Sequence, residues 1–146
     1  MTSLSVICMP VLLDTNTEVS HLYGQWARLY HYGHICMPTV AVCAAGLYAF
    51  VALRYRAANN KQWLVYAVAG ATTISIVPFT LLIMNSTNNA LFRRHALAVA
   101  SPTTTEDKST AHELLVKWAW LHLCRSVFPL AGSILGFFGI LKEVGI

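Results

Sequence analysis

The sequence predicts an all-α membrane protein: a four-helix bundle with three full transmembrane helices and a shortened N-terminal first helix. Composition is the first reason, because 56% of the residues are hydrophobic and only 11% are charged, whereas soluble domains carry about 25% charged residues. The mean hydropathy of +0.55 is the second. The third is that the apolar residues gather in long runs, which lipid can cover and a small soluble core cannot.

Length and charge indicate one domain without a nucleic-acid partner. The chain has 146 residues, which predicts a single transmembrane helical domain with one polar loop at 85–112. Ten Lys and Arg against six Asp and Glu give a net charge of +4. The basic residues lie mostly at the ends of the apolar runs, as membrane flanks do, so we expect the lipid bilayer as partner. The charges of the two flanks are too similar to predict orientation, and the oligomeric state stays open.

The apolar runs predict the four helices in order. Leu4–Leu13 is short and predicts a half-span. Gly33–Leu53, Trp63–Met84 and Trp118–Leu141 contain 21 to 24 residues each, with at most one charged residue. About 20 apolar residues are needed to cross a hydrocarbon core about 30 Å thick. These three runs are therefore predicted to span the membrane completely.

Small residues and prolines recur within the runs. Small residues at helical spacing let helix backbones approach closely in lipid; they are Ala41, Ala45, Ala49, Gly132, Gly136 and Gly139. Each run also contains one proline, which removes a helix hydrogen-bond donor; these are Pro10, Pro38, Pro78 and Pro129. The prolines predict either ordinary kinks or a hydrated pocket where the freed carbonyls are satisfied.

The connection 85–112 is predicted to be a loop because it contains the polar stretch Ser101–Thr110. Thr110 followed three residues later by Glu113 has the spacing of a capping box. We therefore expect the last helix to begin at this point, before its apolar run.

Polar side chains fall at one end of the predicted bundle. If consecutive helices cross in alternating directions, the ends of the runs near Asp14, Gly33, Met84 and Trp118 share one side. That side collects the residues able to do chemistry: Asp14, Gln25, His31, His34, Asn85, Asn88, Asn89, His122 and Arg125. One membrane face is therefore predicted to carry the functional site.

Two pairs at helical spacing form the centre of this candidate site. His31 and His34 are three residues apart, as are His122 and Arg125, so each pair shares a helix face. An arginine inside a transmembrane run costs at least ~2.5 kcal/mol unless it meets a polar interior. We expect Arg125 to point inward, with Asp14 or the Asn85–Asn89 cluster as its partner.

The residue types suit acid–base chemistry on a flat aromatic ligand. Histidine can accept a proton near neutral pH, and Arg or Asn side chains can stabilise a developing oxyanion. The candidate catalytic residues are His31, His34, His122, Arg125 and Asn88. The candidate substrate-binding residues are Asp14, Gln25, Trp26, Tyr30, Asn85 and Trp118, although tryptophans at a membrane interface also serve as belt residues. A metal site is not predicted; the alternative is iron or copper bound by His31, His34 and His122.

Four sequence blocks, in order and over nearly the whole chain, resemble the anthrone-oxygenase-like family of small membrane proteins. The blocks are Pro10-Val-Leu-Leu-Asp14, Gln25-Trp-Ala-Arg-Leu-Tyr-His-Tyr-Gly-His34, Pro78-Phe-Thr with Met84-Asn-Ser-Thr-Asn88, and Trp118-Ala-Trp-Leu-His122-Leu-Cys-Arg125. The resemblance implies four membrane helices. Relatives have a complete first helix, so it also implies that the first helix of this chain is shortened.

The resemblance further implies an oxygenase that converts an anthrone-like polyketide phenol to its anthraquinone with dioxygen. His31 or His34 would then remove a proton from the activated methylene, and Arg125 and Asn88 would stabilise the enolate. Because the substrate supplies its own electrons, no cofactor is required beyond dioxygen as co-substrate; iron or copper is the alternative. A rival hypothesis is a non-catalytic membrane protein, either an assembly subunit or a small-ligand carrier.

Overall fold

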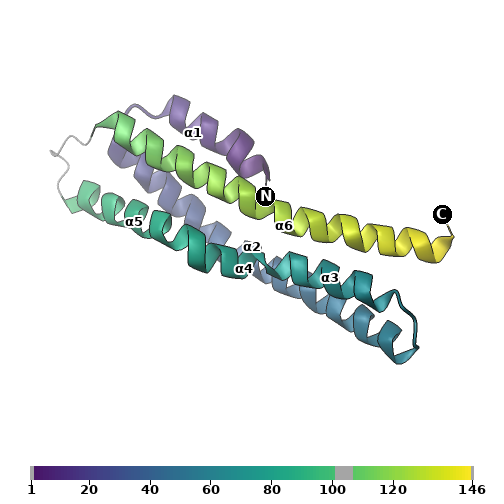
Figure 1. Cartoon of the computed structure of the whole chain (residues 1–146). Helices are drawn as coiled ribbons and strands as arrows, with labels where there is room; N and C mark the ends of the chain where they lie inside the picture. Colours follow the sequence, from purple (N-terminus) through teal and green to yellow (C-terminus); the bar gives the residue numbers. More distant parts are fainter. Residues whose placement is uncertain (1, 101–106, 146) are drawn as a thin grey trace. The chain divides into compact units, whose positions relative to one another are not determined.

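The computed structural model describes residues 2–100 and 107–145. Over these residues the chain forms helices and no strand, which confirms the all-α class. The helical segments follow one another as four stretches (Figure 1), namely Leu4–Thr15, Val19–Ala57, Trp63–Ala100 and Lys108–Val144.

Two of the four stretches are single helices, and two are composite. Val19–Ala57 is α2 and Lys108–Val144 is α6, and each continues through an internal proline. The first stretch consists of the π-helical turn η1 (Leu4–Cys8) and α1 (Met9–Thr15). The third consists of α3 (Trp63–Ile74), α4 (Ile76–Phe79), the π-helical turn η2 (Thr80–Met84) and α5 (Asn85–Ala100).

Three of the stretches, α2, Trp63–Ala100 and α6, are long and apolar enough to cross a membrane, and Leu4–Thr15 is shorter. This confirms the prediction of three long apolar helices and a short first one. The 39 residues of α2 extend about 58 Å at about 1.5 Å per residue, against a hydrocarbon core of about 30 Å. A helix of this length would therefore continue beyond the core.

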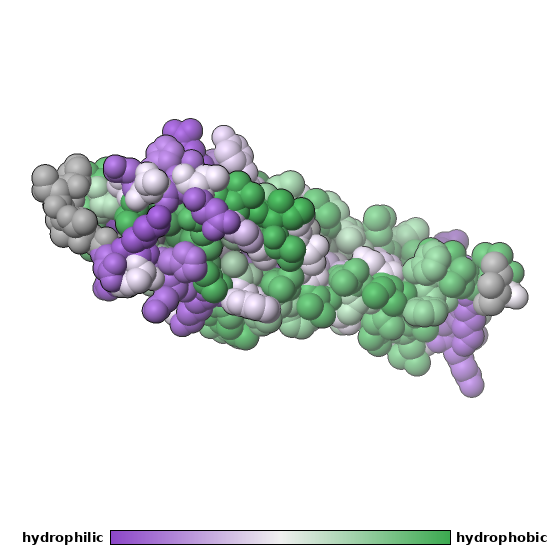
Figure 2. All heavy atoms as spheres, turned by 90° about the horizontal axis from the view of Figure 1, so that it is seen from above, coloured by the Kyte–Doolittle hydropathy of each residue, from purple (hydrophilic) through white to green (hydrophobic). Residues whose placement is uncertain are grey.

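The chain divides into two compact units. The first comprises Met1–Ile35 and Thr80–Arg125, and the second comprises Cys36–Phe79 and Ser126–Ile146. Both α2 and α6 contribute one part to each unit. In the space-filling view, hydrophobic residues cover much of the visible surface, and hydrophilic residues gather mainly on the first unit (Figure 2).

The second unit is held together by close helix approach at glycines of α6. A Cβ atom placed on Gly136 would lie 2.5 Å from Cε1 of Tyr48, and one on Gly139 would lie 3.0 Å from the ring of Tyr66. Both tyrosines therefore pack directly on the α6 backbone. The predicted role of these glycines in close packing is confirmed, because lipid-embedded helices associate through such contacts.

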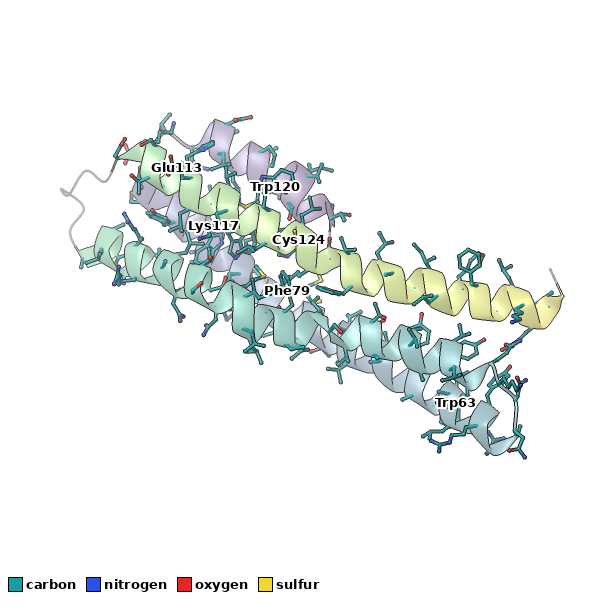
Figure 3. The ribbon with its side chains drawn as sticks, in the orientation of Figure 1. Trp63, Phe79, Glu113, Lys117, Trp120 and Cys124 are labelled. Carbon is teal, nitrogen blue, oxygen red and sulfur yellow. The ribbon has the colours of Figure 1, made fainter. Side chains whose placement is uncertain are left out.

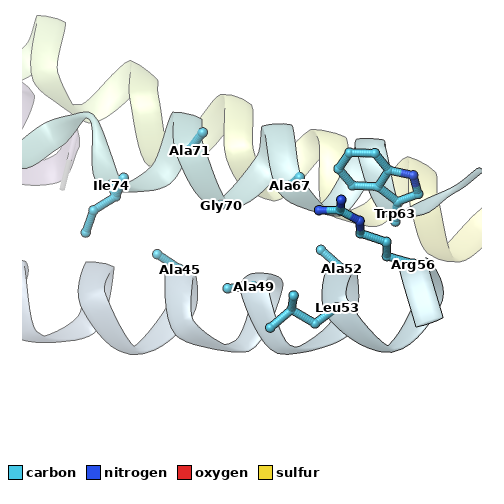
Figure 4. A pocket seen from close by; sticks show the side chains of 10 residues that line it. All are labelled: Ala45, Ala49, Ala52, Leu53, Arg56, Trp63, Ala67, Gly70, Ala71 and Ile74. Carbon is cyan, nitrogen blue, oxygen red and sulfur yellow. The ribbon is translucent and has the colours of Figure 1, made fainter.

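A shallow apolar groove lies between α2 and α3 in the same unit. Its volume is about 430 Å³, and small side chains form most of its wall (Figure 4). At one end the Arg56 guanidinium lies 5.2 Å from the centre of the Trp63 ring. The small residues that line the groove are Ala45, Ala49, Ala52, Ala67, Gly70 and Ala71.

The prediction of a polar loop at 85–112 is wrong over most of its length. Residues Asn85–Ala100 form the helix α5, and α6 begins at Lys108; residues 101–106 lie outside the described part. No glycine or proline interrupts Asn85–Ala100, and its Leu91 is fully buried. Low hydropathy over a segment does not exclude a helix, because one buried face is sufficient to retain it.

The start of α6 also differs from the predicted capping box at Thr110. Asp107 lies just before the helix, and its carboxylate accepts hydrogen bonds from the backbone N–H of Ser109, at 3.2 Å, and from the Ser109 hydroxyl. These bonds hold the pKa of Asp107 below its usual range. An Asp in this position satisfies free N–H groups of the first turn, so the helix begins before Thr110.

Candidate functional site

One face of α6 carries the centre of the site in the first unit. Trp118, His122 and Arg125 are spaced by four and three residues and are only 3%, 2% and 7% exposed. Trp120 and Cys124 lie on the exposed side of the same helix (Figure 3). The expectation that Arg125 points inward is confirmed, and His122 and Trp118 share its buried face.

Asn88 on α5 joins this group through Trp118. The indole N–H of Trp118 donates to Oδ1 of Asn88 at 2.9 Å, and Asn88 is itself buried. The Trp118 ring also packs on the His122 imidazole, with ring centres 5.0 Å apart. Oδ1 of Asn88 is thus engaged as an acceptor, and the donor of this amide is Nδ2.

Trp118 belongs to a cluster of aromatic rings from α2, α5 and α6. Trp26 on α2 is fully buried and meets Trp118 edge to face at 5.9 Å. Phe92 on α5 contacts both Trp26 and Tyr30, each with ring centres 5.0 Å apart. Phe92 lies one helical turn after Asn88, so the spacing identifies it once the region is recognised as a helix.

His122 is held by a residue that sequence reasoning missed. Oγ of Ser5, on η1, lies 3.1 Å from Nδ1 of His122, and both side chains are buried. These residues are 117 positions apart. A single serine within an apolar run carries no local signal, so only the tertiary structure identifies this contact.

The predicted partners of Arg125 are wrong. Its Nη1 group donates to Oγ1 of Thr80, the first residue of η2, at 3.2 Å. Asp14 is exposed, and neither Asp14 nor Asn85 is the residue that bonds Arg125.

Two buried donors in this unit have no hydrogen-bond partner among the residues that the structure describes. They are Nε1 of Trp26 and Nε of Arg125. An unpaired buried donor costs roughly 1–3 kcal/mol, and the cost persists wherever water is excluded. A ligand oxygen would satisfy either group.

His31 and His34 lie outside the buried group. Both are exposed, with ring centres 5.7 Å apart. Nδ1 of His34 lies 3.1 Å from the carbonyl oxygen of Tyr30. The His34 imidazole also stacks on the Tyr30 ring, with ring centres 5.4 Å apart. Because a carbonyl only accepts, this bond requires a proton on Nδ1 of His34.

The remaining predicted substrate-binding residues are not buried. Asn85 is exposed like Asp14, and Gln25 is half-buried. Oε1 of Gln25 accepts from Nδ2 of Asn16 at 2.8 Å, and its Nε2 lies 2.9 Å from Nε2 of His21. Gln25 therefore belongs to a local polar cluster with Asn16 and His21.

Within residues 2–100 and 107–145, no three His, Cys, Asp or Glu side chains are grouped as metal ligands. The alternative set of His31, His34 and His122 is therefore not brought together as a metal site. The geometry instead combines one buried imidazole, one buried guanidinium and a wall of aromatic rings. This arrangement can remove a proton from a flat aromatic molecule and stabilise the negative charge that results.

Comparison with known proteins places the chain in a family. Residues 26–135 match the sequence pattern of the family described as anthrone oxygenase. The chain belongs to the anthrone oxygenase family. The matched range includes Trp26, Asn88, Trp118, His122 and Arg125, so most of the buried group lies within it.

Curated anthrone oxygenases resemble the chain over most of its length. One from Cryptosporiopsis sp. (strain 8999) is 49% identical over 99% of this chain and 79% of its own. One from Paecilomyces divaricatus is 48% identical over 95% of this chain and 85% of its own. One from Aspergillus terreus is 46% identical over 99% of this chain and 91% of its own. No solved structure matches the chain.

Proposed function

We propose that this chain is a multi-pass membrane oxygenase that converts an anthrone-like polyketide phenol to the anthraquinone with dioxygen. Family membership supports the reaction class, and three long apolar helices support insertion in a bilayer. The observation that carries the mechanism is the buried pair His122 and Arg125, three residues apart on one face of α6.

The proposed reaction begins with removal of a proton from the methylene between the two aromatic rings. We assign the base to His122 because, of the three candidate histidines, it is the one that lies in the buried aromatic group, against the Trp118 ring, whereas His31 and His34 are exposed. Loss of the proton gives an enolate whose charge develops on the substrate oxygen. A fixed cation and fixed N–H donors stabilise such charge most strongly where water is excluded.

The donors for this oxygen are the groups that lack a partner. Nε of Arg125 and Nε1 of Trp26 are both buried and unpaired among the described residues, and Nδ2 of Asn88 is a further N–H donor. Tyr30, Trp26 and Trp118 provide the aromatic wall for a tricyclic substrate, because offset and edge-to-face ring contacts add roughly 0.5–1.5 kcal/mol each.

The remaining steps balance with dioxygen alone. The enolate carbon gives its electron pair to dioxygen and forms a carbon–oxygen bond, which yields a hydroperoxide after protonation. Removal of the second proton from the same carbon then forms the carbonyl as the O–O bond breaks, and hydroxide leaves as water. One anthrone and one dioxygen thus give one anthraquinone and one water, and the substrate is the reductant.

Rates of quinone formation by the purified protein, above spontaneous air oxidation, test the proposal. His122→Gln keeps a polar side chain but removes the base, so we expect turnover to fall by about 10²- to 10⁴-fold. His112→Gln is the matched control, since His112 lies exposed on the same helix. Membrane yield and melting temperature should stay normal in both variants.

The alternative bases are tested in the same series. If His122→Gln is fully active, the base is His34 or His31, and the corresponding Gln variants identify which. If all three variants retain full activity, this histidine set does not catalyse. If the wild-type protein forms no quinone above the spontaneous rate, the chain is not an oxygenase, and a subunit or carrier role replaces the proposal.

A further inference from the structure

Both π-helical turns in the described part of the chain supply a hydroxyl to the buried pair on α6. Ser5 belongs to η1 and contacts Nδ1 of His122 at 3.1 Å. Thr80 begins η2 and accepts from Nη1 of Arg125 at 3.2 Å. All four residues lie in the first unit. Two separate segments therefore make equivalent contacts to two adjacent functional side chains.

The local sequence accounts for η1. Pro10 follows η1 by two residues, and because a proline lacks the N–H, the carbonyl of Val6 inside this turn has no regular α-helical donor. In η1 the N–H of Met9 bonds to the carbonyl of Leu4, five residues earlier. Such π-turns are rare and occur frequently at functional sites.

We propose that Ser5 and Thr80 are positioning residues that orient His122 and Arg125 for proton removal; this inference rests on the proposed function. For His122 the argument concerns the tautomer. A neutral imidazole carries one proton, and the hydrogen bond at one nitrogen decides which nitrogen holds it. If Ser5 accepts from Nδ1–H, then Nε2 is the unprotonated nitrogen and faces the substrate as the base.

Thr80 performs the equivalent function for the guanidinium. Its bond to Nη1 fixes one arm of the planar group, and the Nε of Arg125 remains unpaired and buried. A guanidinium fork has fixed donor directions, so holding one arm sets the direction of the others. Thr80 thus determines which Arg125 donor is presented to the developing oxyanion.

Paired substitutions test the two roles. Ser5→Ala and Thr80→Val remove the hydroxyls, whereas Ser5→Thr and Thr80→Ser retain them and should restore activity. Ser3→Ala and Thr72→Val are matched controls: Ser3 is exposed in the same N-terminal segment, and Thr72 is half-buried in the same helical stretch as Thr80. In Ser5→Ala and Thr80→Val we expect kcat to fall about 10- to 100-fold, as when orienting partners are removed, with KM nearly unchanged.

A second measurement does not depend on turnover. In ¹⁵N-histidine-labelled protein in micelles, the ring nitrogen shifts of His122, assigned with His122→Gln, report its tautomer. We expect a proton on Nδ1 in the wild type and in Ser5→Thr, and movement of the population toward the Nε2–H tautomer in Ser5→Ala. Thr80→Val should leave the tautomer unchanged while it lowers kcat.

The outcomes separate this inference from the proposed function. If Ser5→Ala changes neither the tautomer nor kcat, or if Thr80→Val keeps the wild-type kcat, the corresponding positioning role is refuted. If the wild type shows no oxygenation but Ser5→Ala shifts the tautomer, the orientation of His122 stands and the proposed reaction fails. If Ser5→Thr does not restore what Ser5→Ala loses, the effect is packing and the inference fails.

Discussion

The contact between α6 and α3 at Gly132 allows a quantitative prediction for the second unit. A Cβ atom at Gly132 would overlap the Thr73 hydroxyl and lie 2.8 Å from the carbonyl oxygen of Ala69 and 3.3 Å from Cβ of Thr73. The Thr73 side chain can rotate, but the Ala69 oxygen is backbone and already accepts from Thr73 at 2.8 Å. Gly132→Ala must therefore move the two helices apart.

The expected cost follows from a matched comparison. Overpacking of a close contact costs about 1–3 kcal/mol, whereas the helical propensity of Ala exceeds that of Gly by about 0.8–1.0 kcal/mol. Gly46→Ala gains only the helical propensity of Ala, because nothing lies within 4 Å of a Cβ placed on Gly46. The difference in unfolding free energy between the two variants, about 1–3 kcal/mol, isolates the packing term.

Thermal unfolding in one detergent, followed by circular dichroism, measures this difference. For a chain of this size each kcal/mol moves the melting temperature by about 2–4 °C, so Gly132→Ala should melt about 2–12 °C below Gly46→Ala. Thr73→Ala added to Gly132→Ala should restore only part of the loss, since the Ala69 oxygen remains. Equal stability of the two single variants would refute the close approach of α6 to α3.

Three further predictions concern the first unit. Asn88→Leu leaves the buried Trp118 N–H unpaired, so we expect a stability loss of about 1–3 kcal/mol in chemical unfolding, whereas Trp118→Phe in the same background should recover part of it. Arg125→Lys keeps the charge but loses the planar fork of donors; turnover should fall at least about tenfold with normal membrane yield, and unchanged turnover would exclude Arg125 as the oxyanion donor. Hydrogen bonds from Ser109 lower the pKa of Asp107. The charged carboxylate therefore stabilises the start of α6 fully at pH values above the ordinary Asp pKa of ~4. This stabilisation is lost as the pH falls through the lowered pKa. The protection factor of the Ser109 amide, which corrects the exchange rate for its intrinsic pH dependence, should therefore fall on acidification, and Asp107→Asn should reduce that change.

The long helices could be predicted because hydropathy measures the property that lipid selects. The runs Gly33–Leu53, Trp63–Met84 and Trp118–Leu141 fall within three helices that could span a membrane. Hydropathy does not predict the helix α5 (Asn85–Ala100), because most residues of its first half are polar and it has only a few buried residues, such as Leu91. Those residues gain their stabilisation from tertiary contacts, which a hydropathy window does not contain.

The candidate site was predictable where a single residue imposes a large physical cost. Arg125 could be placed inward because a lipid-facing guanidinium is expensive. Its partner could not be predicted, since Asp14 and Thr80 are both polar and only the tertiary arrangement determines which one is near. Ser5 is a stronger example, because its functional meaning arises entirely from a contact with His122.

The histidines show why spacing alone does not identify a buried site. His31 with His34 and His122 with Arg125 have the same three-residue separation, yet the first pair is exposed and the second is buried. Spacing establishes a shared helix face but does not determine which face is covered.

The neighbouring residues on each helix provide the missing information. On α6, Ala111, Leu115 and Trp118 are buried at intervals of four and three residues, and continuing that pattern reaches His122 and Arg125. On α2, the buried or half-buried residues Trp26, Tyr30, Gly33, Met37 and Ala41 lie at intervals of four, three, four and four, and this stripe passes beside His34 without including it. A histidine in phase with a buried stripe of its helix is therefore the stronger candidate for a buried base, and it is the structure that shows which stripe is buried.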